Sequence, residues 1–184
     1  MSEATPAPAK LYIIAFDYVE DWIPEFLAEF IRDKYGLACQ ILPKEPVLPP
    51  EFFVPAIQAY VNSWAIEHLF DRLPADGKWI LGITSLLLWS YSEQALTQGS
   101  GSPERKTAVF TTARLGLCLH CFQTLPAYVR YQLINITMHE LGHVFGLPHC
   151  NNKHCIMTVG WMAPPLDYCD ACRAKVDAYL AQNR

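Results

Sequence analysis

The chain has 184 residues, enough for one domain with its own core, and 52% of them are hydrophobic against 17% charged. A formal net charge of −4 without a basic run argues against nucleic acid as a partner. No apolar stretch is long enough to span a bilayer, and the N-terminus carries no secretion signal. We therefore expect a cytoplasmic monomer that binds neither membranes nor nucleic acid.

The start of the chain predicts a disordered tail followed by a strand, a helix and a strand. Residues 1–9 are rich in Pro and Ala and form the tail, and residues 10–16 are an apolar run of β-forming side chains. Helical spacing of apolar residues then begins after Asp21, a candidate N-cap, and ends at Gly36. Residues 37–43 predict the second strand. This order predicts parallel pairing with a right-handed crossover.

The next part of the chain predicts a connector, a helix and a strand. Residues 43–55 are rich in proline and predict an extended connector. Residues 54–70 have the apolar spacing of a helix, and residues 78–84 predict a third strand. His68 lies in this helix and is expected to be a surface or packing residue, because no other metal-ligand residue accompanies it.

A polar segment and a fourth strand follow. Residues 92–105 contain several Gly and Ser residues and predict a mobile loop. Residues 107–112 alternate between polar and apolar, which predicts a half-exposed strand. Such a strand could accept an extended peptide by strand addition or could be an ordinary edge strand.

The seven cysteines are unevenly distributed, and their odd number rules out complete pairing within the chain. Cys118 and Cys121 form a C-x-x-C without a second pair; we expect buried or solvent-facing thiols, with a metal or redox site as the alternative. A later cluster suits one tetrahedral thiolate zinc without an open position, hence a structural ion, with two disulfides as the alternative. Its members are Cys150, Cys155, Cys169 and Cys172.

The longest helical pattern, residues 128–145, carries a metal-binding motif. His139 and His143 are four residues apart, so both side chains lie on one helix face and can bind one ion. Glu140 is displaced by one residue and points beside that ion, where a carboxylate can act as a base. The His-Glu-x-x-His pattern alone is weak evidence, because it also occurs by chance in helices whose histidines bind no metal.

Three residues after this helix strengthen the motif. Gly146 permits the left-handed backbone that ends the helix, and Pro148 prevents its continuation. The chain can then return to place His149 as the third ligand, which leaves one zinc position open for catalysis. The predicted chemistry is hydrolysis of a peptide bond, with Glu140 taking a proton from the zinc-activated water.

The complete run, His-Glu-x-x-His-x-x-Gly-x-x-His with a later methionine, resembles the signature of the metzincin zinc proteases. Within that clan the chain resembles the archaemetzincins, whose pattern adds nearby cysteines. Here these are Cys150, then Cys155-Ile156-Met157, then Cys169-Asp170-Ala171-Cys172.

The resemblance implies an α/β (α+β) fold: a compact metzincin-type domain with a twisted mixed sheet, packed helices and an active-site helix. An N-terminal subdomain would span residues 10–146. A small irregular subdomain stapled by zinc would span residues 147–184, with a closing helix over residues 170–180.

The resemblance also implies two zinc ions. The three histidines would bind a catalytic ion and the four cysteines a structural ion, while Met157 would form the floor under the first metal. Val159 stands where some other metzincins carry a tyrosine, so Trp161 and Tyr168 are considered as rim residues, and His154 is expected to be solvated.

Two other classes of function compete with a peptidase. The first is a non-catalytic or latent zinc protein that binds peptides or protein partners, although such a protein needs no carboxylate at the position of Glu140. The second is a four-cysteine zinc knuckle for nucleic acid, which the few basic residues around the cysteines disfavour.

Overall fold

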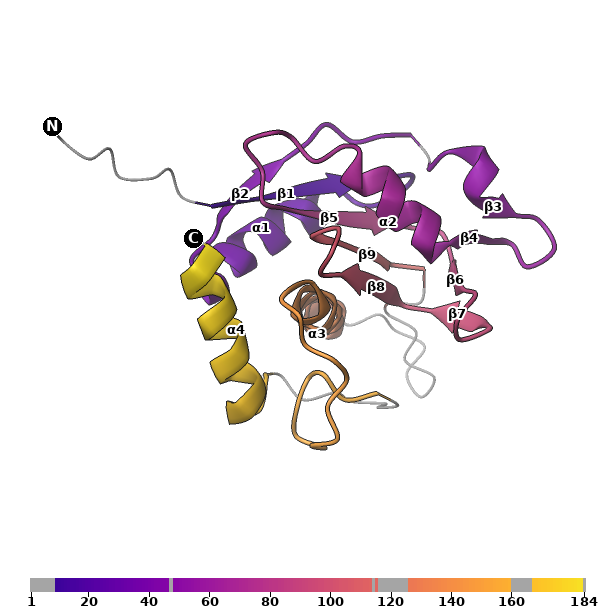
Figure 1. Cartoon of the computed structure of the whole chain (residues 1–184). Helices are drawn as coiled ribbons and strands as arrows, with labels where there is room; N and C mark the ends of the chain where they lie inside the picture. The colour runs from indigo at the N-terminus through magenta and orange to yellow at the C-terminus, as the bar shows by residue number, and fades with distance from the viewer. Residues whose placement is uncertain (1–8, 47, 114, 116–125, 160–166, 184) are drawn as a thin grey trace, which may run out of the picture.

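The computed structural model describes residues 9–46, 48–113, 115, 126–159 and 167–183. Its larger sheet is mixed, as expected (Figure 1): four strands run parallel, and the last runs antiparallel to its neighbour. The strand order is β2 (Ala38–Ile41), β1 (Lys10–Ala15), β5 (Trp79–Thr84), β9 (Thr107–Thr111) and β8 (Gly99–Ser102).

A smaller sheet and the helices complete the described fold. The strand order of the smaller sheet is β3 (Phe53–Val54), β4 (Ala59–Val61), β6 (Leu88–Ser90) and β7 (Ala95–Thr97). The helices are α1 (Trp22–Tyr35), the 3-10 turn η1 (Pro50–Phe52), α2 (Asn62–Phe70), α3 (Pro126–Val144) and α4 (Asp170–Asn183).

The larger sheet separates two hydrophobic cores because successive side chains of a strand point to opposite faces. On β1, Leu11 and Ile13 face a core that also contains residues of α1, α3 and α4. Tyr12 and Ile14 face a smaller core that includes Leu69 of α2. Figure 1 shows the same layering, with α2 on one side of the sheet and the other three helices on the other side. None of the helices in the described ranges is long and apolar enough to cross a membrane.

From residue 10 on, the beginning of the chain folds as predicted; the predicted tail lies outside the described residues except for residue 9. β1 and β2 are parallel and are joined by α1, which ends at Gly36 with φ of 65°. Asp21 stands at the N-cap position of α1, as predicted, but its side chain makes no cap hydrogen bond within the described residues. Its carboxylate instead accepts a hydrogen bond from Lys44 at 2.8 Å.

The predicted helix over residues 54–70 is too long, since α2 begins only at Asn62. Pro55 cannot donate a backbone hydrogen bond, and Gln58 adopts a left-handed φ of 53°. The chain therefore turns between β3 and β4, and Tyr60 pairs with Leu88 of β6.

Two predictions around residue 100 are also wrong. The expected mobile loop, residues 92–105, contains β7 and β8. The expected edge strand is β9, which is buried along its whole length between β5 and β8. The edge strand next to β9 is therefore β8, whose sequence Gly-Ser-Gly-Ser has no strand signal of its own.

Candidate active site

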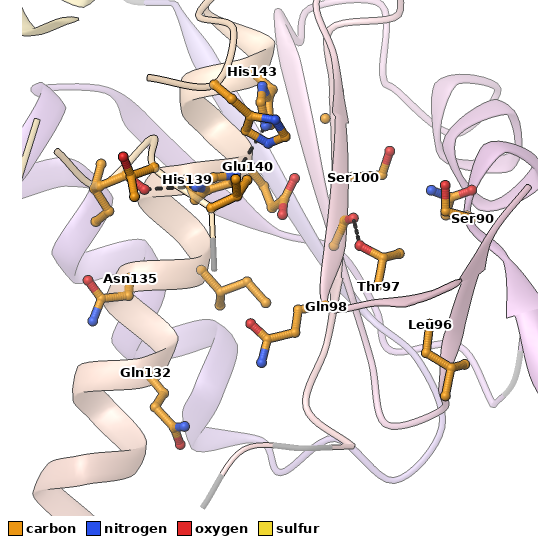
Figure 2. Close-up of a pocket in the computed structure, with 18 of the residues that line it drawn as sticks. Ser90, Leu96, Thr97, Gln98, Ser100, Gln132, Asn135, His139, Glu140 and His143 are labelled. Atoms are coloured by element: carbon orange, nitrogen blue, oxygen red, sulfur yellow. Dashed lines mark hydrogen bonds between the residues drawn. The ribbon is translucent and has the colours of Figure 1, made fainter. Parts of the chain in front are cut away.

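Helix α3 presents its apolar side to the core and the side that carries His139 and His143 to a cleft. Met138 and Leu141 are fully buried, as the helical pattern predicts. His139, Glu140 and His143 lie on the neighbouring face and line a cleft of about 470 Å³ between α3 and β8 (Figure 2). The helix thus supplies three of the predicted active-site side chains from one turn.

Gly146 turns the chain back toward these residues. Its φ is +84°, and a Cβ at this position would meet nothing within 4 Å, so backbone conformation alone requires glycine. The N–H of Leu147 donates to the carbonyl of Gly142 at 2.9 Å and closes the turn. His149 then lies with its ring 4.8 Å from that of His143 and 5.3 Å from that of His139.

Backbone carbonyls fix the ring orientation of two histidines. The Nδ1 atoms of His139 and His143 lie 2.8 Å from the carbonyl oxygens of Ile156 and Leu147, respectively. A carbonyl only accepts hydrogen bonds, so each Nδ1 carries the hydrogen and each Nε2 keeps a free lone pair. Those two Nε2 atoms face each other at 3.1 Å, an arrangement that a cation between them would stabilise.

The distances between the three histidines fit a zinc ion. Their ligand atoms all lie within 4.8 Å of one another, and ligand nitrogens of tetrahedral zinc are roughly 3.3 Å apart. Burial lowers the pKa of His139 to about 4 and also lowers the pKa of His143. Both rings are therefore neutral at pH 7, which is the form that binds metal.

Glu140 lies inside the same cleft with only 5% of its surface exposed. Burial raises its pKa to about 8, and the negative charge of Glu93 on the cleft rim contributes in the same direction. A divalent cation beside the carboxylate opposes both effects, because it favours the charged form. A buried carboxylate with this proton affinity suits the role of general base.

The four clustered cysteines form a second candidate metal centre. Their sulfur atoms all lie within 4.8 Å of one another, and Cys150 Sγ is 4.0 Å from Cys169 Sγ. Thiolates around tetrahedral zinc are roughly 3.8 Å apart, whereas a disulfide needs about 2.05 Å. All four are free thiols, so the disulfide alternative is wrong. The remaining members of the cluster are Cys155 and Cys172.

Local hydrogen bonds and burial shift the pKa values of these thiols in opposite directions. The backbone N–H of Cys169 donates to Cys155 Sγ at 3.3 Å, and that of Asn152 donates to Cys150 Sγ at 3.4 Å. The backbone of Cys172 lowers the pKa of Cys169 to about 7, while burial raises the pKa of Cys155 and Cys172. A bound cation would favour all four thiolates.

Met157 lies directly beneath the histidine helix. It is fully buried, and a Cβ on Gly142 would come within 2.4 Å of its sulfur. Its carbonyl accepts a hydrogen bond from the N–H of Cys150 at 2.9 Å. Met157 therefore packs against the turn of α3 between His139 and His143, in a position that only glycine on the helix permits.

The other residues considered from sequence have different outcomes. Tyr168 is not a rim residue: it is 6% exposed, and its hydroxyl donates to the carbonyl of Met138 at 2.6 Å. His68 packs against the ring of Phe52, as expected, and His154 is exposed. The predictions for Cys118, Cys121 and Trp161 lie outside the described residues.

The sequence patterns missed two features of the cleft. One is Asn135, which lines the cleft one turn before His139 and is 4% exposed; neither of its amide atoms has a hydrogen-bond partner among the described residues. The other is β8, whose glycines lie against Glu140. No sequence signal identifies either feature, because the first depends on packing and the second on strand pairing.

Several known proteins are similar to this chain in sequence. The sequence model of Peptidase family M54 matches residues 122–178. The chain is 32% identical to the archaemetzincin of Pyrococcus horikoshii over 180 residues, with 90% of each chain covered. It is 27% identical to that of Methanocaldococcus jannaschii over 163 residues, which cover 86% of this chain and 87% of the relative.

Solved structures share the fold. The archaemetzincin of Archaeoglobus fulgidus in complex with malonate superposes with a TM-score of 0.76 at 22% identity, covering 90% of this chain and 99% of that one. The archaemetzincin of Methanopyrus kandleri gives a TM-score of 0.77 at 21% identity, covering 95% of this chain and 96% of that one.

Proposed function

Because the chain belongs to the archaemetzincin family, peptidase family M54, and is a zinc metallopeptidase, we propose specific roles for its cleft residues. His139, His143 and His149 bind the catalytic zinc, and Glu140 is the general base. The observation that carries this proposal is the convergence of three imidazoles beside one buried carboxylate in one cleft.

The chain's own groups divide the work of hydrolysis. A zinc ion held by the histidines would supply Lewis-acid activation of water and of the scissile carbonyl. Glu140 takes a proton from the attacking water and passes it to the leaving nitrogen. The carbonyls of Ile156 and Leu147 keep two of the imidazoles in the tautomer that leaves Nε2 free.

The substrate peptide pairs with β8 and not with the strand over residues 107–112 that the sequence indicated. The N–H of Thr111 donates to the carbonyl of Gln98 at 2.8 Å, which sets the alternation of hydrogen bonds along the β8–β9 pair. The backbone groups of Gly99 and Gly101 therefore point away from β9. The groups of Gly101 are available to an extended peptide that crosses the cleft, whereas Gly99 is buried and its carbonyl already accepts a hydrogen bond from the Thr97 hydroxyl.

The four cysteines bind a second zinc, which is structural. Four thiolates complete a tetrahedral site and leave no position for substrate. The ion staples residues 147–184, whose only long element among the described residues is α4, to the rest of the protein. A division into subdomains at Gly146 follows from this proposal, and Met157 supports the catalytic site from the C-terminal side.

We also propose a cellular compartment and an oligomeric state for this peptidase. Five free cysteines in the described ranges suit a reducing compartment, so the cytoplasm remains our proposal. A monomer without affinity for nucleic acid also remains a prediction. A non-catalytic zinc protein is not favoured, because the family is one of peptidases and Glu140 is retained.

A peptide-library digest followed by mass spectrometry tests the proposed roles. Zinc-loaded wild type should cleave peptides, and Glu140→Ala with the same zinc content should release no fragments above the buffer control. The fragments also define the residues around the cleaved bond. Equal fragment patterns from both proteins would reject Glu140 as the base.

A further inference from the structure

The edge strand β8 packs against the catalytic helix through two glycines. Gly99 and Gly101 are two residues apart, so they present the same face of the strand. A Cβ built on Gly99 would lie 2.5 Å from Oε1 of Glu140, 2.6 Å from its Cδ and 2.7 Å from its Cγ. Carbon atoms do not approach so closely, so a side chain at Gly99 would displace the carboxylate.

The second glycine meets the helix itself. A Cβ on Gly101 would lie 2.4 Å from the backbone carbonyl oxygen of Glu140 and 2.8 Å from Cβ of His143. Gly101 therefore sets the separation between strand and helix, whereas the three atoms nearest to a Cβ on Gly99 all belong to the side chain of Glu140. The two positions predict different consequences for substitution.

We propose that Gly99 is a positioning residue for Glu140. Because Gly99 has no side chain, β8, the strand that pairs with substrate, packs closely against the Glu140 carboxylate and fixes its position. The inference deepens the proposed function and rests on the role of Glu140 as base. It concerns the orientation of that base, whereas the family signature concerns only its presence.

The surroundings hold Gly99 itself in place. The strand is paired with β9 on its inner side, and the hydroxyl of Thr97 donates to the carbonyl of Gly99 at 2.8 Å. Figure 2 shows this bond, with Glu140 pointing from α3 toward the strand and Ser100 projecting on its other side. A peptide that pairs with the outer edge of β8 at Gly101 thus lies along the strand that contacts the base.

The substitution Gly99→Ala should act on turnover more than on binding. A Cβ at Gly99 would meet only the Glu140 side chain among its three nearest atoms, so we expect Glu140 to shift while the fold and both zinc ions persist. A misplacement of about 1 Å costs up to about a hundredfold in rate. We expect kcat to fall about tenfold or more, with KM within about threefold of wild type. Ser63→Ala, at an exposed position of α2 outside the cleft lining, is the control and should keep both constants.

A double-mutant cycle identifies the contact. Glu140→Asp shortens the side chain by one methylene and reduces kcat by itself. In the Gly99→Ala background this shortening relieves the clash, so the combined loss should be smaller than the product of the two single losses. Unchanged kcat in Gly99→Ala, or losses that simply multiply, would overturn the inference.

If Gly99→Ala folds poorly, a double-mutant cycle on the melting temperature replaces the kinetic one. Glu140→Ala removes all three contacted atoms, so it should restore the melting temperature of the Gly99→Ala protein; a failure to restore it would overturn the inference. The two proposals fail in different ways. Undiminished hydrolysis by Glu140→Ala rejects the base, whereas an inactive Glu140→Ala beside a fully active Gly99→Ala rejects only the role of Gly99.

Discussion

The Nδ1 atom of His139 lies 2.8 Å from the carbonyl oxygen of Ile156, the residue between Cys155 and Met157. The first proposed ligand of one zinc is therefore oriented by the loop that carries a ligand of the other. A second link runs along the chain, since His149 precedes Cys150 directly. The two candidate metal centres share both a hydrogen bond and a peptide bond.

This coupling predicts that the loss of a cysteine ligand also impairs the function of the histidine site. Cys172→Ser should lower the free energy of unfolding by about 3 kcal/mol or more, and by more than Glu140→Ala does, because it removes a ligand of the structural ion. Peptide hydrolysis should fall as well, although Cys172 lies outside the cleft. Thermal melting and peptide cleavage provide the measurements.

Cys39→Ser is the control for that variant. Cys39 is a half-buried thiol on β2 that belongs to neither ligand cluster, and burial raises its pKa to about 11. Its replacement should leave zinc content and hydrolysis unchanged. Equal melting curves for Cys172→Ser and wild type would contradict a structural staple.

Gly142→Ala tests the packing of Met157. Alanine normally stabilises a helix relative to glycine by about 1 kcal/mol. Here the new Cβ would lie 2.4 Å from Met157 Sδ, so we expect a net loss of about 1–3 kcal/mol and weaker zinc binding at the histidines. Chemical denaturation of the zinc-loaded protein measures the loss.

A second substitution separates this clash from backbone strain. Met157→Ala should suppress much of the loss caused by Gly142→Ala. It should not suppress the loss caused by Gly146→Ala, where a Cβ meets no atom and only the φ of +84° is unfavourable. Additive losses for Gly142→Ala and Met157→Ala would show that the sulfur does not pack against the helix as described.

The zinc-binding motifs were predictable because their spacing determines their geometry. His139 and His143 need only one helix, and Gly146 needs only its own backbone conformation. The edge strand β8 was not predictable, since Gly and Ser have weak strand propensity and the segment forms a strand only by pairing with β9. Its register places Gly99 beside Glu140, and no pattern within residues 92–105 contains that information.

Asp17 offers a test of pH dependence away from the metals. The residue is 7% exposed, and its Oδ2 accepts a hydrogen bond from the Thr84 hydroxyl at 2.7 Å, while Oδ1 has no partner in the part of the chain that the structure describes. Burial raises its pKa, so the folded state retains a proton that the unfolded state has released. Stability is therefore lost as pH rises from the ordinary pKa through the raised one, and the penalty is complete above it.

Asp17→Asn removes this titration and keeps a side chain that tolerates the left-handed φ of 58°. We expect a gain of about 1 kcal/mol at pH 7, or about 2–4 °C in melting temperature, and a smaller gain at pH 4. The exposed Asp33→Asn serves as control and should change little. A gain at pH 4 as large as that at pH 7 would contradict burial of the charge.

The most direct test measures zinc content and peptide hydrolysis on one preparation of Glu140→Ala. The account predicts two zinc ions per chain and a loss of turnover of about a thousandfold or more. His149→Ala, measured in parallel, should retain the cysteine-bound ion alone. A Glu140→Ala protein that holds both ions and still cleaves peptides at the wild-type rate would contradict the account.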